Sequence, residues 1–181
     1  MIRLLILIKI MNLNSWVIVF DLDDTLYPEK SYFLSGLSSV EKFITKSFNI
    51  PFDGEIRKAS KNGINDLWGW CCEKLGLPLE IKESLLWVYR LHQPKIKLNS
   101  DVRKLIDTLK KNNATLVILT DGRSVTQRLK INSLNLQYLP LFISEEYCSL
   151  KPNLLRFQEI EKKWKGYKYA YIGDNPLKDF N

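Results

Sequence analysis

Four apolar runs, each ending at a polar residue, recur along the chain and predict β-strands. Residues 16–20 and 116–119 are unbroken and rich in β-branched side chains, a pattern typical of strands buried on both faces. A third run of this kind covers 167–172, and 141–143 forms a shorter one. Amphipathic helical patterns separate these runs, at residues 100–109, 124–133 and 153–165, the first with Ser100 as its expected N-cap. Because strand and helix alternate, we expect an α/β fold with a parallel sheet and helices on both faces.

Residues 27–98 break this alternation, since they hold helical patterns and no convincing strand. The segment follows the first strand directly, so we expect it to form a helical insertion over the carboxyl ends of the strands, where parallel sheets bind ligands. Its helices are predicted at 31–48, 65–75 and 80–91. The expected organisation is an N-terminal extension (1–10), a core (11–26 and 99–181) and an inserted helical domain (27–98).

The composition indicates one globular core with an insertion, because 181 residues with 45% hydrophobic and 26% charged side chains are ordinary globular values. The formal net charge is +7. The lysines are scattered near predicted helix ends and form no long basic stripe, so we interpret them as solvated surface charge. The net positive charge also allows a role in processing the ends of nucleic acids, which is the weakest of the functional alternatives.

The three cysteines include the adjacent pair Cys71 and Cys72, and they form neither a spaced disulfide framework nor a metal-binding pattern. Reduced thiols in the cytoplasm are therefore expected. Lys9 interrupts the apolar start of the chain, which leaves it too short to cross a membrane. Because Met11 stands just before the first strand, either Met1 or Met11 can be the start, and residues 1–10 are expected to be an extension or a loosely held segment.

Carboxylates follow two of the predicted strands. Asp21 and Asp23 come directly after the first strand, and Asp174 and Asp179 follow the run at 167–172. Two negative charges so close together need a positive partner, and all-oxygen ligands are those that Mg²⁺ prefers. The sequence thus predicts a hard-metal site formed by these four aspartates.

The remaining polar residues at strand ends favour an anionic substrate. Thr120 ends the second strand and is followed by Asp121 and Gly122, whose backbone amides can open onto a helix. Lys151 stands just before Pro152. A hydroxyl, backbone amides and an ammonium group together suit a phosphoryl group.

Four short motifs contain these residues, and their order along the chain resembles that of the haloacid dehalogenase-like hydrolase superfamily, whose core is Rossmann-like. The resemblance covers residues 16–180 and is specific because each motif stands at the end of a predicted strand. The four motifs are Asp-Leu-Asp-Asp-Thr at 21–25, Leu-Thr-Asp-Gly at 119–122, Ser-Leu-Lys-Pro at 149–152 and Gly-Asp-Asn-Pro-Leu-Lys-Asp at 173–179.

The resemblance implies roles for the motif residues. Asp21 would be the nucleophile that forms an aspartyl-phosphate, and Asp23 would be the general acid and base. Thr120 and Lys151 would hold the transferring phosphoryl group. Lys151 could also tie down Asp21 and Asp174.

The resemblance also implies a Mg²⁺ cofactor. Its ligands would be Asp21, Asp174 and the backbone carbonyl of Asp23, with Asp179 as a further ligand or as an anchor. Two other polar residues are expected to be structural: Asp24 as a capping residue, and His92, the single histidine, because no catalytic partner for it is evident.

The presence of an acid at Asp23 points to phosphate esters, because the dehalogenases and phosphonate hydrolases of the superfamily lack an acid at this position. The leading hypothesis is a phosphatase acting on a small phosphorylated metabolite, with specificity set by the helical insertion. A phosphomutase and a non-catalytic binding module are the alternatives.

Only seven residues follow Asp174, whereas the resemblance implies a further helix and strand. The core is therefore expected to lack its C-terminal elements, which would leave the strand before Asp174 at an open sheet edge. Self-association through that edge can follow. The expected lack of these elements is the evidence for the non-catalytic alternative.

Overall fold

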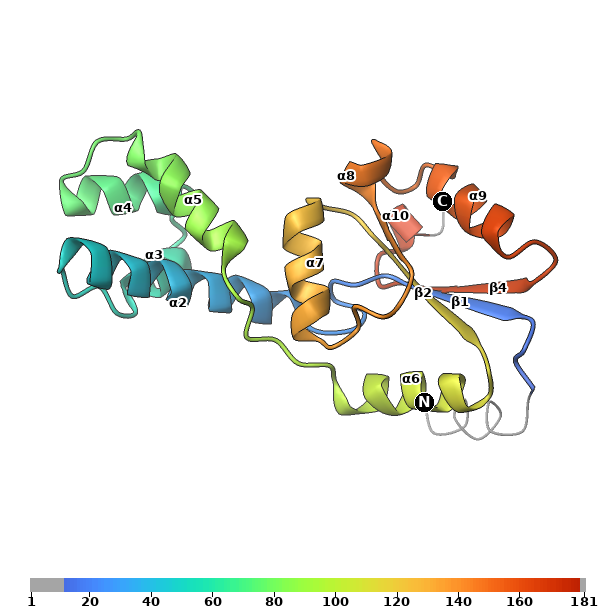
Figure 1. Ribbon diagram of the computed structural model, residues 1–181. Coiled ribbons are helices and arrows are strands. Elements are labelled where there is room, and N and C mark those ends of the chain that lie inside the picture. The colour runs from blue at the N-terminus through green and yellow to red at the C-terminus, as the bar shows by residue number, and fades with distance from the viewer. Residues whose placement is uncertain (1–11, 180–181) are drawn as a thin grey trace. The chain divides into compact units, whose positions relative to one another are not determined.

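The computed structural model describes residues 12–179, so the predicted extension over residues 1–10 lies outside the described residues. The chain divides into two compact units, which can be followed by colour in Figure 1. One unit contains the chain up to Glu29 and from Lys97 onward, and the other contains Lys30 to Ile96.

The first unit is built on a parallel four-stranded sheet with the order β3-β2-β1-β4, which confirms the predicted sheet. The central strand β1 (Trp16–Phe20) pairs with β2 (Thr115–Thr120) on one side and with β4 (Lys168–Ile172) on the other. The short strand β3 (Leu141–Ile143) pairs with β2. Parallel pairing brings the carboxyl ends of all these strands to one edge of the sheet.

The strands differ in burial. Phe20 lies level with Ile118 and Ile172, and β1 and β2 are buried along almost their whole length, as predicted. The prediction of burial on both faces is wrong for β4, where Tyr169 is 37% exposed. The reason is its position, because β4 is the edge strand and, within the described residues, pairs only with β1. The expectation that the strand before Asp174 lies at the sheet edge is thereby confirmed.

Helices cover both faces of this sheet, as predicted. Ile160 of α9 packs against Val17 and Val19, while α6 contacts β2, and Figure 1 shows α9 and α6 on opposite sides of the strands. Ser100 is the first helical residue and not the N-cap, which is Asn99. The helices wholly within this unit are α6 (Ser100–Lys111), α7 (Ser124–Ser133), α8 (Ser144–Tyr147), α9 (Leu155–Lys163) and α10 (Pro176–Asp179).

The second unit is helical, and its core forms where apolar faces of its helices meet. Leu37, Val40 and Ile44 recur at helical spacing and pack with Cys71 and Leu85. The elements of this unit are α2 (Glu29–Phe48), which begins at the end of the first unit, α3 (Glu55–Lys61), α4 (Leu67–Leu75) and α5 (Ile81–Leu91).

The sequence did not predict α3, and its N-terminus explains why. Its N-cap is Gly54, which has no side chain to accept the free amides at the start of the helix. Buried Glu41 of α2 supplies the acceptor instead, taking hydrogen bonds from the amides of Ile56 (2.9 Å) and Arg57 (3.3 Å). The cap therefore comes from a distant part of the chain and leaves no local signal.

Within residues 12–179, no helix is long and apolar enough to cross a membrane. The cysteines Cys71, Cys72 and Cys148 are all free, and the first two are buried. Burial raises the pKa of the Cys71 thiol to about 12, so this side chain acts as an inert part of the helical core.

Candidate active site

A polar pocket of about 230 Å³ opens at the carboxyl edge of the sheet in the first unit. Segments that follow β1, β2 and β4, together with the loop before α9, form its walls. Residues from all the sequence motifs line it: Asp21, Asp23, Thr120, Asp121, Lys151 and Asp174. Asp24, Glu29, Asn175 and Lys178 complete the lining. The fold therefore gathers side chains that stand up to 157 positions apart, the separation between Asp21 and Lys178.

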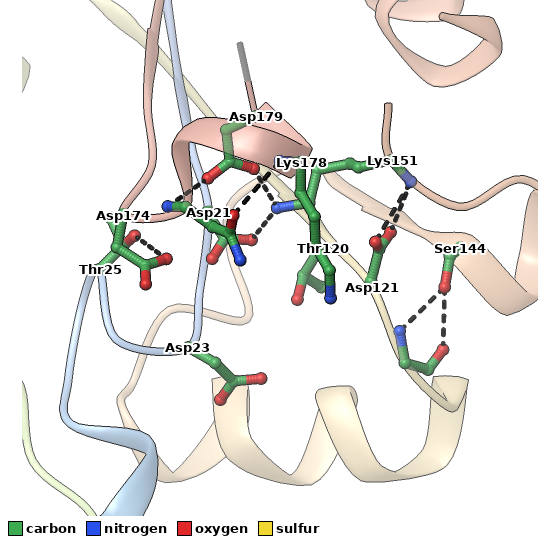
Figure 2. A network of polar contacts seen from close by, with 12 residues as sticks. Asp21, Asp23, Thr25, Thr120, Asp121, Ser144, Lys151, Asp174, Lys178 and Asp179 are labelled. Carbon is green, nitrogen blue, oxygen red and sulfur yellow. Dashed lines mark hydrogen bonds and ion pairs between the residues drawn. The ribbon is translucent and has the colours of Figure 1, made fainter. Parts of the chain in front are cut away.

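Lys151 lies at the centre of a buried polar network (Figure 2). Its Nζ donates to Asp21 Oδ1 at 2.7 Å and to Asp179 Oδ1 at 2.6 Å. A third contact, at 3.1 Å, joins the same Nζ to the hydroxyl of Tyr171. The lysine was expected to tie down Asp21 and Asp174; the structure confirms the first partner but replaces the second with Asp179.

Burial and hydrogen bonding move the pKa values of this network in opposite directions. Burial raises the pKa of Asp21 to about 6, and the contacts with Lys151 offset only part of that shift. Burial alone would also raise the pKa of Asp179, but hydrogen bonds from Lys151, the Asn175 amide and Tyr171 hold it below its usual value. The pKa of Lys151 is raised, because these carboxylates outweigh the effect of its own burial. Lys151 and Asp179 are therefore a stable charged pair beside Asp21.

Asp23 faces a different cation. Figure 2 shows its carboxylate turned away from Asp21 and toward α7. Lys130 of α7 donates to both carboxylate oxygens, at 2.9 and 2.8 Å, and Gln127 of the same helix donates to Oδ2 at 3.1 Å. The hydroxyl of the buried Tyr27 donates to Oδ1. Each of the two aspartates of the first motif thus forms an ion pair with its own lysine.

Thr120 and Asp121 are held by buried donors. Gln127 Nε2 donates to Thr120 Oγ1 at 2.8 Å, and Arg156, which is fully buried, donates to the Thr120 carbonyl at 2.8 Å. Arg156 also pairs with the Asp121 carboxylate, which accepts a hydrogen bond from the Lys151 amide at 3.2 Å. Asp121 therefore positions the loop that carries Lys151, and it does so through its side chain.

Gly122, predicted to bind phosphate, has its amide engaged by another part of the chain. Its amide donates to Ser144 Oγ at 2.9 Å, and it is absent from the pocket lining within the described part of the chain. The prediction assumed that the amides after β2 stay free, but the short helix α8 places Ser144 against them. Gly122 supports the wall behind the pocket.

The oxygen donors of the pocket fit a hard divalent cation. Asp21 and the exposed Asp174 both line the pocket, and Asp174 Oδ1 accepts a 3.5 Å contact from Thr25 Oγ1. Both Asp179 oxygens are already bonded, Oδ1 to Lys151 and Tyr171 and Oδ2 to the Asn175 amide at 3.0 Å. The donor set thus favours an anchoring role for Asp179 over direct ligation.

Across residues 12–179, no three or more His, Cys, Asp or Glu side chains are gathered closely enough to form a metal cluster by themselves. The expected set does not need such a cluster, because it combines two carboxylates with a backbone carbonyl.

Both residues expected to be structural have structural contacts. The Asp24 carboxylate accepts a hydrogen bond from the Glu29 amide at 2.9 Å, which confirms it as a cap at the start of α2. His92 lies buried in the helical unit, bonded to the Tyr89 carbonyl at 2.6 Å and to Ser35 Oγ at 3.1 Å.

The residues that sequence reasoning missed are those that hold the motif side chains in place: Gln127, Lys130, Arg156 and Tyr171. One signal was available. Gln127, Lys130 and Ile131 are buried together on one side of α7, at the spacing of a helix face that packs against a core. A lysine and a glutamine on such a face indicate a buried polar site.

The fold recurs in solved structures of low sequence identity. The HAD-hydrolase YfnB from Bacillus subtilis, bound to magnesium, is 18% identical with a TM-score of 0.61, and the match covers 92% of this chain and 81% of YfnB. The 2-haloacid dehalogenase of Pseudomonas syringae is 17% identical with a TM-score of 0.57, covering 90% and 79% of the two chains. The HAD phosphatase of Thermococcus onnurineus is 22% identical with a TM-score of 0.53, covering 90% and 79%.

No curated protein matches the chain. The family model of haloacid dehalogenase-like hydrolases matches residues 17–179, which include every motif that lines the pocket and all of the sheet except Trp16. The chain belongs to the haloacid dehalogenase-like hydrolase family.

Proposed function

We propose that this hydrolase is a Mg²⁺-dependent phosphatase that acts on a small phosphorylated metabolite through an aspartyl-phosphate at Asp21. One observation carries the proposal: Asp21 and a second acid, Asp23, line the same pocket as Thr120 and Lys151. A nucleophile, an acid–base group and phosphate-holding groups in one pocket are what a two-step phosphoryl transfer requires.

In the first half-reaction, a carboxylate oxygen of Asp21 attacks the phosphorus atom. A bond forms between Asp21 and phosphorus while the bond to the ester oxygen breaks. Asp23 gives its proton to that leaving oxygen, so that an alcohol departs in place of an alkoxide. Lys151 and the Thr120 hydroxyl stabilise negative charge on the oxygens of the transferring group.

In the second half-reaction, a water molecule attacks the phosphorus of the aspartyl-phosphate. Asp23, now a carboxylate, takes a proton from that water, and the bond to Asp21 breaks. Inorganic phosphate leaves, and both aspartates return to their initial states. Splitting one difficult displacement in this way makes each step easier.

Asp21, Asp174 and the backbone carbonyl of Asp23 would hold the magnesium ion. When bound, the ion supplies positive charge that screens the Asp21 carboxylate from the anionic substrate. Lys151 helps to hold Asp21 in place, because its ion pair fixes Asp21 Oδ1. Asp179 in turn fixes Lys151.

The acid at position 23 favours a phosphatase over a dehalogenase, since halide departure needs no proton. Solved relatives include both a phosphatase and a 2-haloacid dehalogenase, so the fold alone does not separate these activities. We assign the choice of substrate to the helical unit, which is inserted into the chain between the first and second motifs.

The three free cysteines favour a reducing compartment, and we propose the cytoplasm.

The test is phosphate release from p-nitrophenyl phosphate and a panel of metabolite phosphates, with Mg²⁺ and with EDTA. We expect turnover by the native chain with Mg²⁺, and its loss with EDTA and in Asp21→Asn. No release by the folded native chain, together with a melting temperature that Mg²⁺ leaves unchanged, would instead favour a non-catalytic binding module.

A further inference from the structure

We propose that Lys130 is a positioning residue for Asp23, and that with Gln127 it forms a clamp that aims the Asp23 carboxylate at the leaving group; this inference rests on the proposed function. The clamp lies on α7, the helix that follows the second motif. None of the motif roles described above accounts for either residue.

The contacts of the clamp cover both oxygens of Asp23. Lys130 Nζ lies 2.9 Å from Oδ1 and 2.8 Å from Oδ2, which is a forked contact from a single ammonium group. Gln127 Nε2 lies 3.1 Å from Oδ2. Gln127 and Lys130 are three positions apart on one helix face, so α7 presents both donors in the same direction. A carboxylate held at both oxygens has little freedom to rotate.

The burial of the Lys130 ammonium group carries a free-energy cost. The Lys130 side chain is only 5% exposed, whereas that of Asp23 is 20% exposed and reaches the pocket. Burying an ammonium group carries a desolvation cost that its ion pair offsets only with good geometry. Well-packed apolar side chains in place of both members of a buried ion pair are often at least as stabilising, so stability alone does not explain this pair. The geometry of the pair therefore points to a role that depends on Asp23.

The clamp also connects the acid–base residue with the phosphate-holding residues. The same Gln127 Nε2 that contacts Asp23 lies 2.8 Å from Thr120 Oγ1 and 2.7 Å from the Asp121 carbonyl. The position of Asp23 is thereby fixed relative to the group that would hold the phosphoryl oxygens. In an in-line displacement, the leaving oxygen departs opposite the nucleophile. Asp23 faces α7, while Asp21 is held on the side of Lys151 (Figure 2).

A positioning role predicts a loss that depends on the leaving group. Phenyl phosphate and p-nitrophenyl phosphate have nearly the same shape, but phenolate is a poor leaving group that needs a proton, whereas p-nitrophenolate departs readily without one. General acid catalysis contributes about 10²–10⁴-fold where a proton is needed. A misplaced Asp23 should therefore slow hydrolysis of phenyl phosphate far more than that of p-nitrophenyl phosphate.

The experiment measures kcat/KM for both esters with the native chain and Lys130→Met in Mg²⁺, because this constant reports the step in which the leaving group departs. We expect a loss of about 100-fold for phenyl phosphate and of less than about 5-fold for p-nitrophenyl phosphate. Lys130→Gln, which keeps a polar donor in the same space, is measured alongside in case Lys130→Met does not fold. It should show the same selectivity, with smaller losses.

The matched control is Arg128→Met on the same helix. Arg128 pairs with Glu146 at 2.6 Å, but its side chain is 57% exposed and it contacts no motif residue in the described structure. We expect equal and small effects on both esters. Equal losses of kcat/KM for the two esters in the Lys130 variants, or no loss, would overturn the clamp. Such a result would leave the proposed phosphatase function unaffected. No turnover by the folded native chain would overturn both proposals.

Discussion

Lys151 joins parts of the first unit that lie far apart in the sequence. Its ammonium group bonds Asp21 after β1, Asp179 in α10 and Tyr171 in β4. The side chains of Asp21 and Asp179 are 9% and 0% exposed, so water can replace the lysine at neither of them. The pocket and the local fold therefore depend on the same buried cation.

We expect Lys151→Met to lower the free energy of unfolding by about 3 kcal/mol, because it leaves two buried carboxylates without their cation. Urea denaturation at neutral pH measures this difference. Lys178→Met is the control, since Lys178 lines the same pocket but is exposed and should change stability little. A loss below about 1 kcal/mol in Lys151→Met, the range of an exposed ion pair, would contradict the account.

At this scale the sequence predicted the residues that line the pocket better than the residues that hold them in place. Asp21, Thr120, Lys151 and Asp174 stand at the ends of apolar runs, and a parallel sheet brings such ends together. Arg156 has no such marker. It is an arginine in an amphipathic helix, and its full burial against the ends of β2 and β3 depends on tertiary packing. The hydrogen bond from the Gly122 amide to Ser144 of α8 depends on tertiary packing in the same way and has no local signal.

The helices of the second unit depend on side-chain caps, some local and some distant. Asp66 is a local one: it is the N-cap of α4, accepts a hydrogen bond from the Gly69 amide at 3.0 Å, and pairs with Lys82 of α5 at 2.6 Å. Apolar periodicity predicted α4 and α5 to within two residues at each end, whereas α3 was missed because Glu41 caps it from α2. Local patterns thus predict a helix only where its ends are also fixed locally.

The cap at Asp66 makes the stability of this unit depend on pH. Hydrogen bonds from Lys82 and then from Gly69 lower the pKa of Asp66 below its usual value of 3.8. A lowered pKa means that the charged cap stabilises the fold above about pH 4, and that this contribution is lost as the pH falls through the folded-state pKa.

We expect Asp66→Ala to destabilise the chain by about 1 kcal/mol at pH 7, the typical value of an N-cap. Asp66→Asn keeps a capping oxygen and should lose much less. Thermal unfolding of the native chain and both variants is measured between pH 7 and about pH 3. The difference in stability between the native chain and Asp66→Ala should narrow only at the lowest pH values. A stability difference that stays constant down to the lowest pH would contradict a charged cap.

For the molecule as a whole, we propose that the open edge at β4 allows self-association. Within the described residues β4 pairs only with β1, and Tyr169 and Tyr167 beside it are 37% and 36% exposed. A sheet edge with exposed apolar side chains can pair with another chain. Charged residues on such an edge prevent this pairing.

Sedimentation velocity over a range of protein concentrations measures the association. We expect the native chain to form larger species as its concentration rises, and Tyr169→Lys to shift the distribution toward monomer. Tyr138→Lys is the matched control, because Tyr138 is 53% exposed but lies outside the strands. A native chain that stays monomeric at every concentration would contradict the proposal.

The central claim concerns the whole reaction: Asp21 carries the phosphoryl group between its two halves. The most direct measurement mixes the native chain with p-nitrophenyl phosphate and Mg²⁺, quenches with acid, and locates the phosphoryl group by peptide mass spectrometry. The account predicts a hydroxylamine-sensitive acyl phosphate on the peptide that contains Asp21, and neither this adduct nor turnover in Asp21→Asn. A phosphoryl group on another residue, or turnover that survives in Asp21→Asn, would contradict it.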